Sequence, residues 1–250
     1  MAEHILKTHG LTKNFGNKPA LLEVGMEIER GAIYGFIGKN GAGKTTLMRI
    51  VCGLASATKG GVELFGKTKP SELMQTRAKI GSMIEMPSLY KNLTAVDNLE
   101  IQRRVMGIDD RECIQRALKA VDLTDTGKKK VKQFSLGMKQ RLGLAIALLG
   151  DPELLILDEP INGMDPVGIT EVREVLLGLV KDKGMTILIS SHILTELHRL
   201  ATHYGIINDG RLIKQVTAAE LDAECARNGQ DIEEYYISLV RGASNQGGGK

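Results

Sequence analysis

The sequence predicts an α/β fold in which helices cover a parallel sheet and an antiparallel sheet lies beside it. Three segments, IYGFIG (33–38), LLILDEP (154–160) and MTILISSH (185–192), contain continuous apolar runs. Such runs are typical of parallel strands that are buried on both faces. Two other segments, LLEVGMEIERG (21–31) and GVELFG (61–66), alternate apolar and polar residues. That alternation indicates half-exposed antiparallel strands, so both kinds of sheet are expected.

The composition is that of an ordinary globular protein. The chain has 250 residues, of which 42% are hydrophobic and 25% are charged, and its formal net charge is +3. This charge is too small to indicate nucleic acid binding, and three scattered cysteines suggest neither disulfides nor a metal site. The N-terminus lacks the apolar core of a signal peptide. The most apolar segment, residues 142–150, is shorter than the ~20 residues of a spanning helix. We therefore expect a soluble, cytoplasmic protein.

Residues 87–150 show helical patterns in place of strand patterns. The first helix is expected to begin at Thr94, because Asp97 follows three residues later, as in a capping box. We expect its inward-facing residues to be Val96, Leu99 and Met106. Two more helical patterns follow, in residues 109–121 and 135–150.

These patterns predict one domain, residues 1–240, that contains a core and a helical subdomain. Residues 1–86 and 151–240 form the core, and residues 87–150 form the helical insert. Asp209-Gly210 predicts a tight hairpin turn near the end of the core. The tail, residues 241–250, has little apolar content and is expected to be disordered.

The segment GKNGAGKT (38–45) fits the phosphate-loop pattern G-x-x-x-x-G-K-[ST]. A predicted strand precedes it and a helical pattern follows, as a P-loop NTPase core requires. Its glycines allow backbone N–H groups to surround phosphate oxygens. Lys44 is expected to reach the β- and γ-phosphates, and the Thr45 hydroxyl to bind Mg²⁺. The predicted ATP-binding residues here are Gly38, Lys39, Asn40, Gly41, Ala42, Gly43, Lys44, Thr45 and Thr46.

Two carboxylates follow the buried strand in LLILDEP. Asp158 lies at the carboxyl end of this strand, where such sheets bind ligands, and is expected to bind Mg²⁺. Glu159 comes next and is expected to polarise a water molecule in line with the γ-phosphate. Together with the phosphate loop, this pair predicts nucleotide hydrolysis.

Further motifs resemble those of the ATP-binding-cassette (ABC) family. FSLGMKQRLGLA (134–145) is similar to the family's signature helix: Ser135 and Gly137 match, whereas Leu136 and Met138 depart from the common form. NGMD (162–165) looks like the D-loop that follows. The resemblance extends over residues 5–240, which implies an ABC ATPase fold.

The resemblance also implies a role for each matching residue. In this family, two chains lie head to tail, and the signature of each chain contacts the ATP of the other. The implied partner is therefore a second copy of this chain or a paired ATPase subunit. The implied residues are Ser135, Gly137 and Met138 for ATP binding in trans, Asp165 for communication across the dimer, His192 for a catalytic contact to the γ-phosphate, and Phe15 for stacking on adenine. The implied cofactors are ATP and Mg²⁺.

Glu85 stands where most ABC ATPases carry Gln, a residue that contacts Mg²⁺ and relays the nucleotide state, so the resemblance implies that Glu85 binds the metal. A carboxylate here resembles the ATPases of bacitracin and lantibiotic self-protection exporters. The resemblance implies an ATPase subunit that is peripheral on the inner face of the cell membrane, works with integral-membrane subunits, and does not bind nucleic acid. The lysine run at 128–132 is expected to be a solvated loop, with contact to anionic lipid or to a membrane subunit as the alternative.

Other functions fit the sequence less well. Chromosome-maintenance and DNA-repair ATPases with related heads are split by long coiled coils, and no heptad run is present. A ribosome-acting ABC ATPase would be expected to carry two cassettes. A GTPase is disfavoured because the NKPA segment (17–20) lacks the guanine-reading Asp and precedes the phosphate loop. An ABC exporter with another cargo is the remaining alternative.

Overall fold

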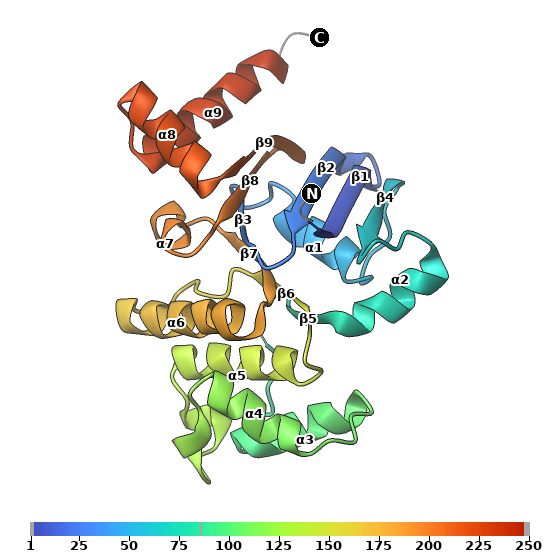
Figure 1. The fold of residues 1–250 in the computed structure, drawn as a ribbon, viewed down its shortest axis with the longest axis vertical. Coiled ribbons are helices and arrows are strands. Elements are labelled where there is room, and N and C mark those ends of the chain that lie inside the picture. Colours follow the sequence, from blue (N-terminus) through green and yellow to red (C-terminus); the bar gives the residue numbers. More distant parts are fainter. Residues whose placement is uncertain (1–2, 86, 248–250) are drawn as a thin grey trace.

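The computed structural model describes residues 3–85 and 87–247 and contains two sheets and a helical insert (Figure 1). The larger sheet has six strands in the order β5-β6-β7-β3-β8-β9, of which β9 alone is antiparallel to its neighbour. Its strands are β5 (Ile80–Met83), β6 (Leu154–Asp158), β7 (Thr186–Ser191), β3 (Ile33–Ile37), β8 (His203–Asn208) and β9 (Arg211–Thr217). The smaller sheet is antiparallel, with the order β2-β1-β4. Its strands are β2 (Lys18–Glu29), β1 (His4–Phe15) and β4 (Lys59–Leu64). The predicted fold class is confirmed.

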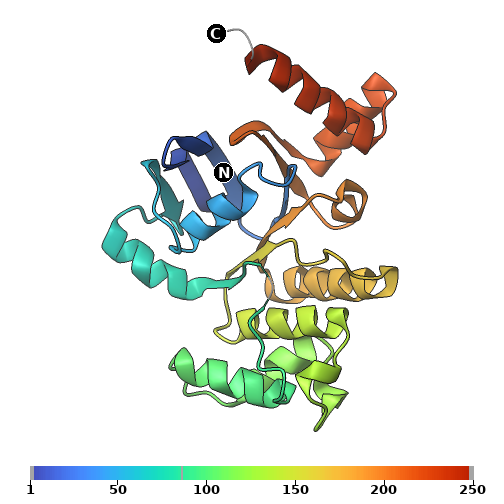
Figure 2. The same ribbon diagram turned by 180° about the vertical axis from the view of Figure 1, so that it is seen from behind.

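Helices pack on both sides of the larger sheet. The core helices are α1 (Lys44–Val51), α2 (Pro70–Thr76), α6 (Pro166–Lys183), α7 (Leu194–His198), α8 (Ala218–Asn228) and α9 (Ile232–Gly247). The insert contains α3 (Ala95–Val105), α4 (Glu112–Ala120) and α5 (Leu136–Leu148). Figures 1 and 2 place the insert at one end of the molecule and α8 and α9 at the other.

Alternation along β6 divides the core into two clusters. Leu154 and Ile156 pack with α1 and the antiparallel sheet, whereas Leu155 and Leu157 pack with α5, α6 and α7. Successive strand side chains point to opposite faces, so a strand between two layers must be apolar at every position. Asp158 is the first polar residue of this strand, and it lies at the strand's carboxyl end.

The hairpin turn at Asp209-Gly210 was predicted correctly. Both residues have positive φ, 45° and 76°, as two-residue hairpin turns with Gly require. The turn also supports the phosphate loop, because the Gly210 N–H donates to the Ala42 carbonyl at 3.0 Å. A Cβ at Gly210 would lie only 2.9 Å from the carbonyl oxygen of Ala20.

Two predicted inward residues of α3 are exposed. Leu99 is fully buried as predicted, but Val96 is 40% exposed and Met106 is 46% exposed. The helix begins at Thr94 with the predicted capping box, and its buried face is formed by Ala95, Asn98, Leu99 and Arg103. Two of these four buried side chains are polar and form hydrogen bonds within the protein. The pattern of apolar residues therefore did not predict which face of the helix is buried.

The end of the chain also differs from the prediction. Residues 241–247 were expected to be disordered, yet α9 continues through them to Gly247. Extending an existing helix requires no new nucleation, so a polar sequence can follow a packed helix. Residues 248–250 lie outside the described part of the chain. Within that part, no helix is both long and apolar enough to cross a membrane.

Candidate functional site

The phosphate loop connects the carboxyl end of β3 to the first turn of α1. Gly43 precedes this helix with φ of 111°, a conformation that side-chain-bearing residues rarely adopt. A Cβ on Gly43 would lie 2.6 Å from the Ala20 carbonyl oxygen. A Cβ on Gly38 would lie equally close, 2.6 Å, to the Ile207 carbonyl oxygen. These two glycines therefore allow the loop to pack tightly against neighbouring backbone.

A cavity of about 180 Å³ opens above this loop. Its walls are Ala20, Lys39, Asn40, Gly41, Gly43, Lys44, Thr45, Thr46 and Glu159. Seven of the nine phosphate-loop residues predicted to bind ATP thus line one hollow. Backbone N–H groups at the start of a helix attract anions, so the cavity suits phosphate.

The Lys44 ammonium group is held by three oxygens at this cavity. The side chain is only 5% exposed, and its Nζ donates to the Gly38 carbonyl at 2.5 Å and to the Lys39 carbonyl at 3.3 Å. The Glu159 carboxylate lies 3.2 Å from the same Nζ. A buried ammonium requires a negative partner, and here the Glu159 carboxylate supplies that charge.

Asp158 lies between two hydroxyl groups. The Thr45 hydroxyl donates to one carboxylate oxygen at 2.6 Å, and the Ser190 hydroxyl donates to the other at 2.6 Å. Asp158 is 6% exposed. The predicted metal-binding pair, Thr45 and Asp158, is therefore in direct contact.

This pair fits Mg²⁺ bound together with a nucleotide. The described residues contain no group of three or more His, Cys, Asp or Glu side chains that could hold a metal alone. Mg²⁺ is usually bound by one or two carboxylates together with substrate phosphates. One carboxylate and one hydroxyl beside a phosphate cavity match that donor set.

Glu159 faces the cavity with an unusual backbone conformation. Its φ is 50°, and its N–H donates to the Ser190 hydroxyl at 2.9 Å. The His192 ring Nδ1 lies 2.7 Å from Glu159 Oε2. Glu159 Oε1 is buried and has no hydrogen-bond donor among the described residues. Its contact with the Lys44 ammonium, at 3.2 Å, is thus an ion pair that balances the charge of this buried oxygen.

The signature residues line a second cavity, of about 460 Å³, that shares no residue with the first. Ser135 caps α5 by accepting a hydrogen bond from the Met138 N–H at 3.1 Å. Asp165 caps α6 in the same way, through the Gly168 N–H at 2.8 Å. Gly137 lies in the wall of this cavity with Ser135, Met138 and Asp165. The structure therefore brings the four residues predicted to act across a dimer to one surface, away from the chain's own phosphate loop.

Phe15 and Glu85 are predicted site residues that line neither cavity. Phe15 is at the end of β1 and is 56% exposed, with the Lys13 ammonium 5.0 Å from the centre of its ring. An exposed ring of this kind is free to stack. Glu85 has φ of 65° and forms an ion pair with Arg49 of α1. The Glu85 carboxylate is thus paired with a cation of α1, and its role at Mg²⁺ stays a prediction.

The sequence analysis missed the part played by Ser190. Its hydroxyl donates to Asp158 and accepts from the Glu159 N–H, so it orients two neighbouring site residues. Ser190 is fully buried at the end of β7, directly beside Asp158 in the sheet register. The only sequence signal is a small hydroxyl residue at the end of a buried strand, and its partner depends on which strands are neighbours.

Comparisons with known proteins agree with this geometry. Residues 21–162 match the model of the ABC transporter family. The chain is 47% identical to the bacitracin transport ATP-binding protein BcrA of Bacillus licheniformis over 85% of this chain and 69% of that protein. It is 47% identical to the lantibiotic transport ATP-binding protein SrtF of Streptococcus pyogenes over 94% of this chain and 97% of that protein. The dimeric structure of MJ0796, a bacterial ABC transporter cassette, superimposes with a TM-score of 0.75 and 25% identity, over 85% of this chain and 98% of that one.

Proposed function

Since this chain belongs to the ABC transporter family, of which it is an ATP-binding subunit and an ATPase, we propose that it powers export of an antimicrobial peptide. The cargo would be of the bacitracin or lantibiotic type, and separately encoded membrane subunits would carry it. The observation that supports this cargo is the equal identity to two relatives that are named for bacitracin and lantibiotic transport. Glu85, at the position where the resemblance places a carboxylate in such exporters, also supports it.

We assign ATP to the cavity above the phosphate loop. Lys44 is the cation nearest to the expected β- and γ-phosphates, and the loop N–H groups supply neutral donors. Thr45 and Asp158 would hold Mg²⁺, which when bound neutralises phosphate charge. Phe15 would stack on the adenine ring, because its side chain is exposed at the end of β1.

Glu159 is assigned as the group that accepts a proton from the attacking water. Its side chain lines the cavity, is 20% exposed, and lies 3.2 Å from the Lys44 ammonium. His192 contacts the other carboxylate oxygen and so would fix the orientation of the side chain. A carboxylate that is held in position near the reacting phosphate is suited to general-base catalysis.

We infer that two copies, or this chain and a paired ATPase subunit, bind two ATP molecules between them. Ser135, Gly137 and Met138 line a cavity that is separate from the phosphate cavity of the same chain. The N-terminus of α5 at this cavity would serve the γ-phosphate of the other chain. Asp165 lies in the same wall and would connect the two sites.

The chain would act as a peripheral subunit on the inner face of the cell membrane, bound to the membrane subunits. To test this, the chain can be purified from membranes of the expressing cell with and without a non-hydrolysable ATP analogue. We expect polytopic membrane proteins to co-purify. Recovery of ribosomes or DNA-repair proteins without membrane proteins would refute the transport assignment.

Resistance assays test the cargo. Cells that contain the membrane subunits are supplied with the wild-type chain, with Glu159→Gln, or with Glu153→Gln as the matched control. Glu153 pairs with Arg30 and Lys79, just before β6 and away from the phosphate loop. We expect the wild type and Glu153→Gln to raise the inhibitory concentration of bacitracin or of a lantibiotic, and Glu159→Gln not to. Resistance to an unrelated compound, without resistance to bacitracin or a lantibiotic, would contradict the proposed cargo.

A further inference from the structure

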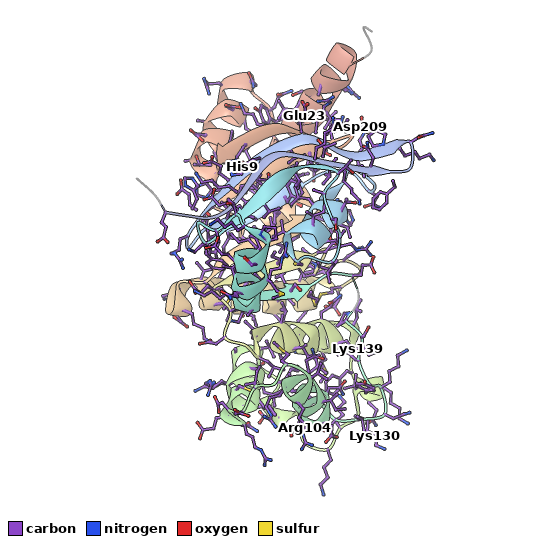
Figure 3. All side chains as sticks on the ribbon, turned by 90° about the vertical axis from the view of Figure 1, so that its right-hand side faces the viewer. His9, Glu23, Arg104, Lys130, Lys139 and Asp209 are labelled. Carbon is purple, nitrogen blue, oxygen red and sulfur yellow. The ribbon has the colours of Figure 1, made fainter. Side chains whose placement is uncertain are left out.

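We propose that a lysine-rich edge of the helical insert binds directly to an anionic lipid surface. This lysine edge consists of Lys91, Lys128, Lys129, Lys130, Lys132 and Lys139. Lys139 is partly buried, and the other five are exposed. Figure 3 shows Lys130 and Lys139 on the same side of the insert.

Backbone and side-chain contacts hold the three segments of the lysine edge together. The Lys132 N–H donates to the Lys91 carbonyl at 2.8 Å, and the Val131 N–H donates to the Leu93 carbonyl at 2.9 Å. The Lys129 ammonium lies 3.9 Å from Met138 Sδ, next to Lys139 in sequence. The segments that carry the lysines are therefore held together by a fixed framework.

The charge of the chain is concentrated in the insert. Residues 87–150 contain twelve Lys and Arg and seven Asp and Glu, which gives +5, whereas the whole chain carries +3. The rest of the chain therefore carries −2. A positive region of this size on a nearly neutral protein attracts anions selectively to one end.

The ion pairs of the insert involve arginines and leave the lysine edge unpaired. Across the described residues, the acidic side chains of the insert that form ion pairs do so with Arg103, Arg104, Arg116 and Arg141. None of the ion pairs found in residues 3–85 and 87–247 includes a lysine of the edge. Asp125 is the one acidic residue between Leu123 and Gln133.

The arrangement suits an extended surface better than a single ligand. The signature cavity is lined by none of the six lysines. Lysine has a compact charge on a long flexible stem, so neighbouring lysines can each contact a different headgroup. This step rests on the proposed function, in which the chain works on the inner face of the cell membrane and a lipid surface would be close by.

Binding to protein-free vesicles tests the inference without any membrane subunit. The purified chain is sedimented with vesicles of phosphatidylcholine alone, or with one third phosphatidylglycerol. We expect binding to the phosphatidylglycerol vesicles only, and its loss in high salt because screening weakens exposed charges. At about fivefold per lysine, the variant Lys128→Gln/Lys129→Gln/Lys130→Gln/Lys132→Gln should bind at least ~10²-fold more weakly.

A matched control replaces four exposed lysines of the core that form no ion pair in the described structure, Lys18, Lys59, Lys69 and Lys181, by Gln. We expect this control to bind vesicles as the wild type does, and thermal unfolding to show that both variants fold. Equal binding of wild type to both vesicle types, or equal loss in both variants, would overturn the inference. So would a lysine-edge variant that still binds vesicles but no longer dimerises with ATP, since the lysines would then serve the second chain. None of these outcomes bears on ATP hydrolysis or on peptide export.

Discussion

Replacing Glu159 by Gln should strengthen ATP binding while it slows hydrolysis. The Glu159 carboxylate lies 3.2 Å from the Lys44 ammonium, the cation that is expected to bind phosphate. ATP must compete with this carboxylate for Lys44. The amide of Gln is neutral and nearly the same size, so the substitution removes the competition without emptying the cavity wall.

The size of the effect follows from the geometry of this pair. Two unit charges at 3.2 Å attract by about 5 kcal/mol at an effective dielectric constant of 20. Lys44 is 5% exposed and Glu159 20%, so much of that attraction is offset by the cost of desolvating both groups. We expect roughly 1.4 kcal/mol to remain, which is about tenfold tighter ATP binding. Loss of the general base should slow hydrolysis by ~10² or more.

Equilibrium titration with a fluorescent ATP analogue in EDTA measures the affinity, and phosphate release measures turnover. With ATP, the variant should also accumulate as a dimer on size-exclusion chromatography. Glu153→Gln is the control, because it removes a carboxylate from an ion pair at the opposite end of β6. Wild-type affinity in Glu159→Gln would refute the competition with Lys44, and wild-type turnover would remove Glu159 from the catalytic role.

Three further predictions concern other elements. Ser135→Arg should leave ATP affinity of the monomer almost unchanged and abolish ATP-driven dimerisation, measured by light scattering; a collapse of monomer affinity would contradict the action in trans. Glu85→Gln should bind ATP more tightly than wild type in EDTA, with the advantage lost in saturating Mg²⁺; identical affinity ratios in the two titrations would show that Glu85 does not reach the site. Hydrogen bonds from two arginines lower the pKa of Glu100 from 4.5 to about 2. The ionised carboxylate therefore stabilises the fold above pH 4.5, and this stabilisation is lost as the pH falls from 4.5 to about 2. Thermal unfolding of Glu100→Gln should accordingly depend less on pH in that range, and an unchanged pH profile would contradict the assignment.

Features that are determined by residues close together in the sequence were predicted correctly, whereas features that depend on tertiary contacts were not. The buried strands, the hairpin at Asp209-Gly210 and the start of α3 at Thr94 are determined by neighbouring residues, and all three were predicted correctly. The buried face of α3 was not, because Arg103 is buried through bonds to Glu100 and to loop carbonyls. Such a face depends on tertiary partners that apolar periodicity does not reveal.

The same distinction applies to the site. The glycines and Lys44 lie in one short segment, so the phosphate loop could be identified from spacing alone. The contacts of Asp158 with Ser190, and of Glu85 with Arg49, join segments that are far apart in sequence. Predicting the contact of Asp158 with Ser190 would have required the strand order, since the pairing of β6 with β7 places the two residues side by side.

The positions of the two cavities support the proposal that two chains act together. The phosphate cavity is formed by the carboxyl end of the large sheet, whereas the signature cavity is formed by the first turns of α5 and α6. The two cavities share no lining residue. Two chains arranged head to tail would bring each signature to the other's phosphate loop, and the symmetry would create two equivalent sites. In that arrangement, ATP would supply negative charge to Lys44, which is paired with Glu159 in this structure, so nucleotide binding and release of this carboxylate would become one event.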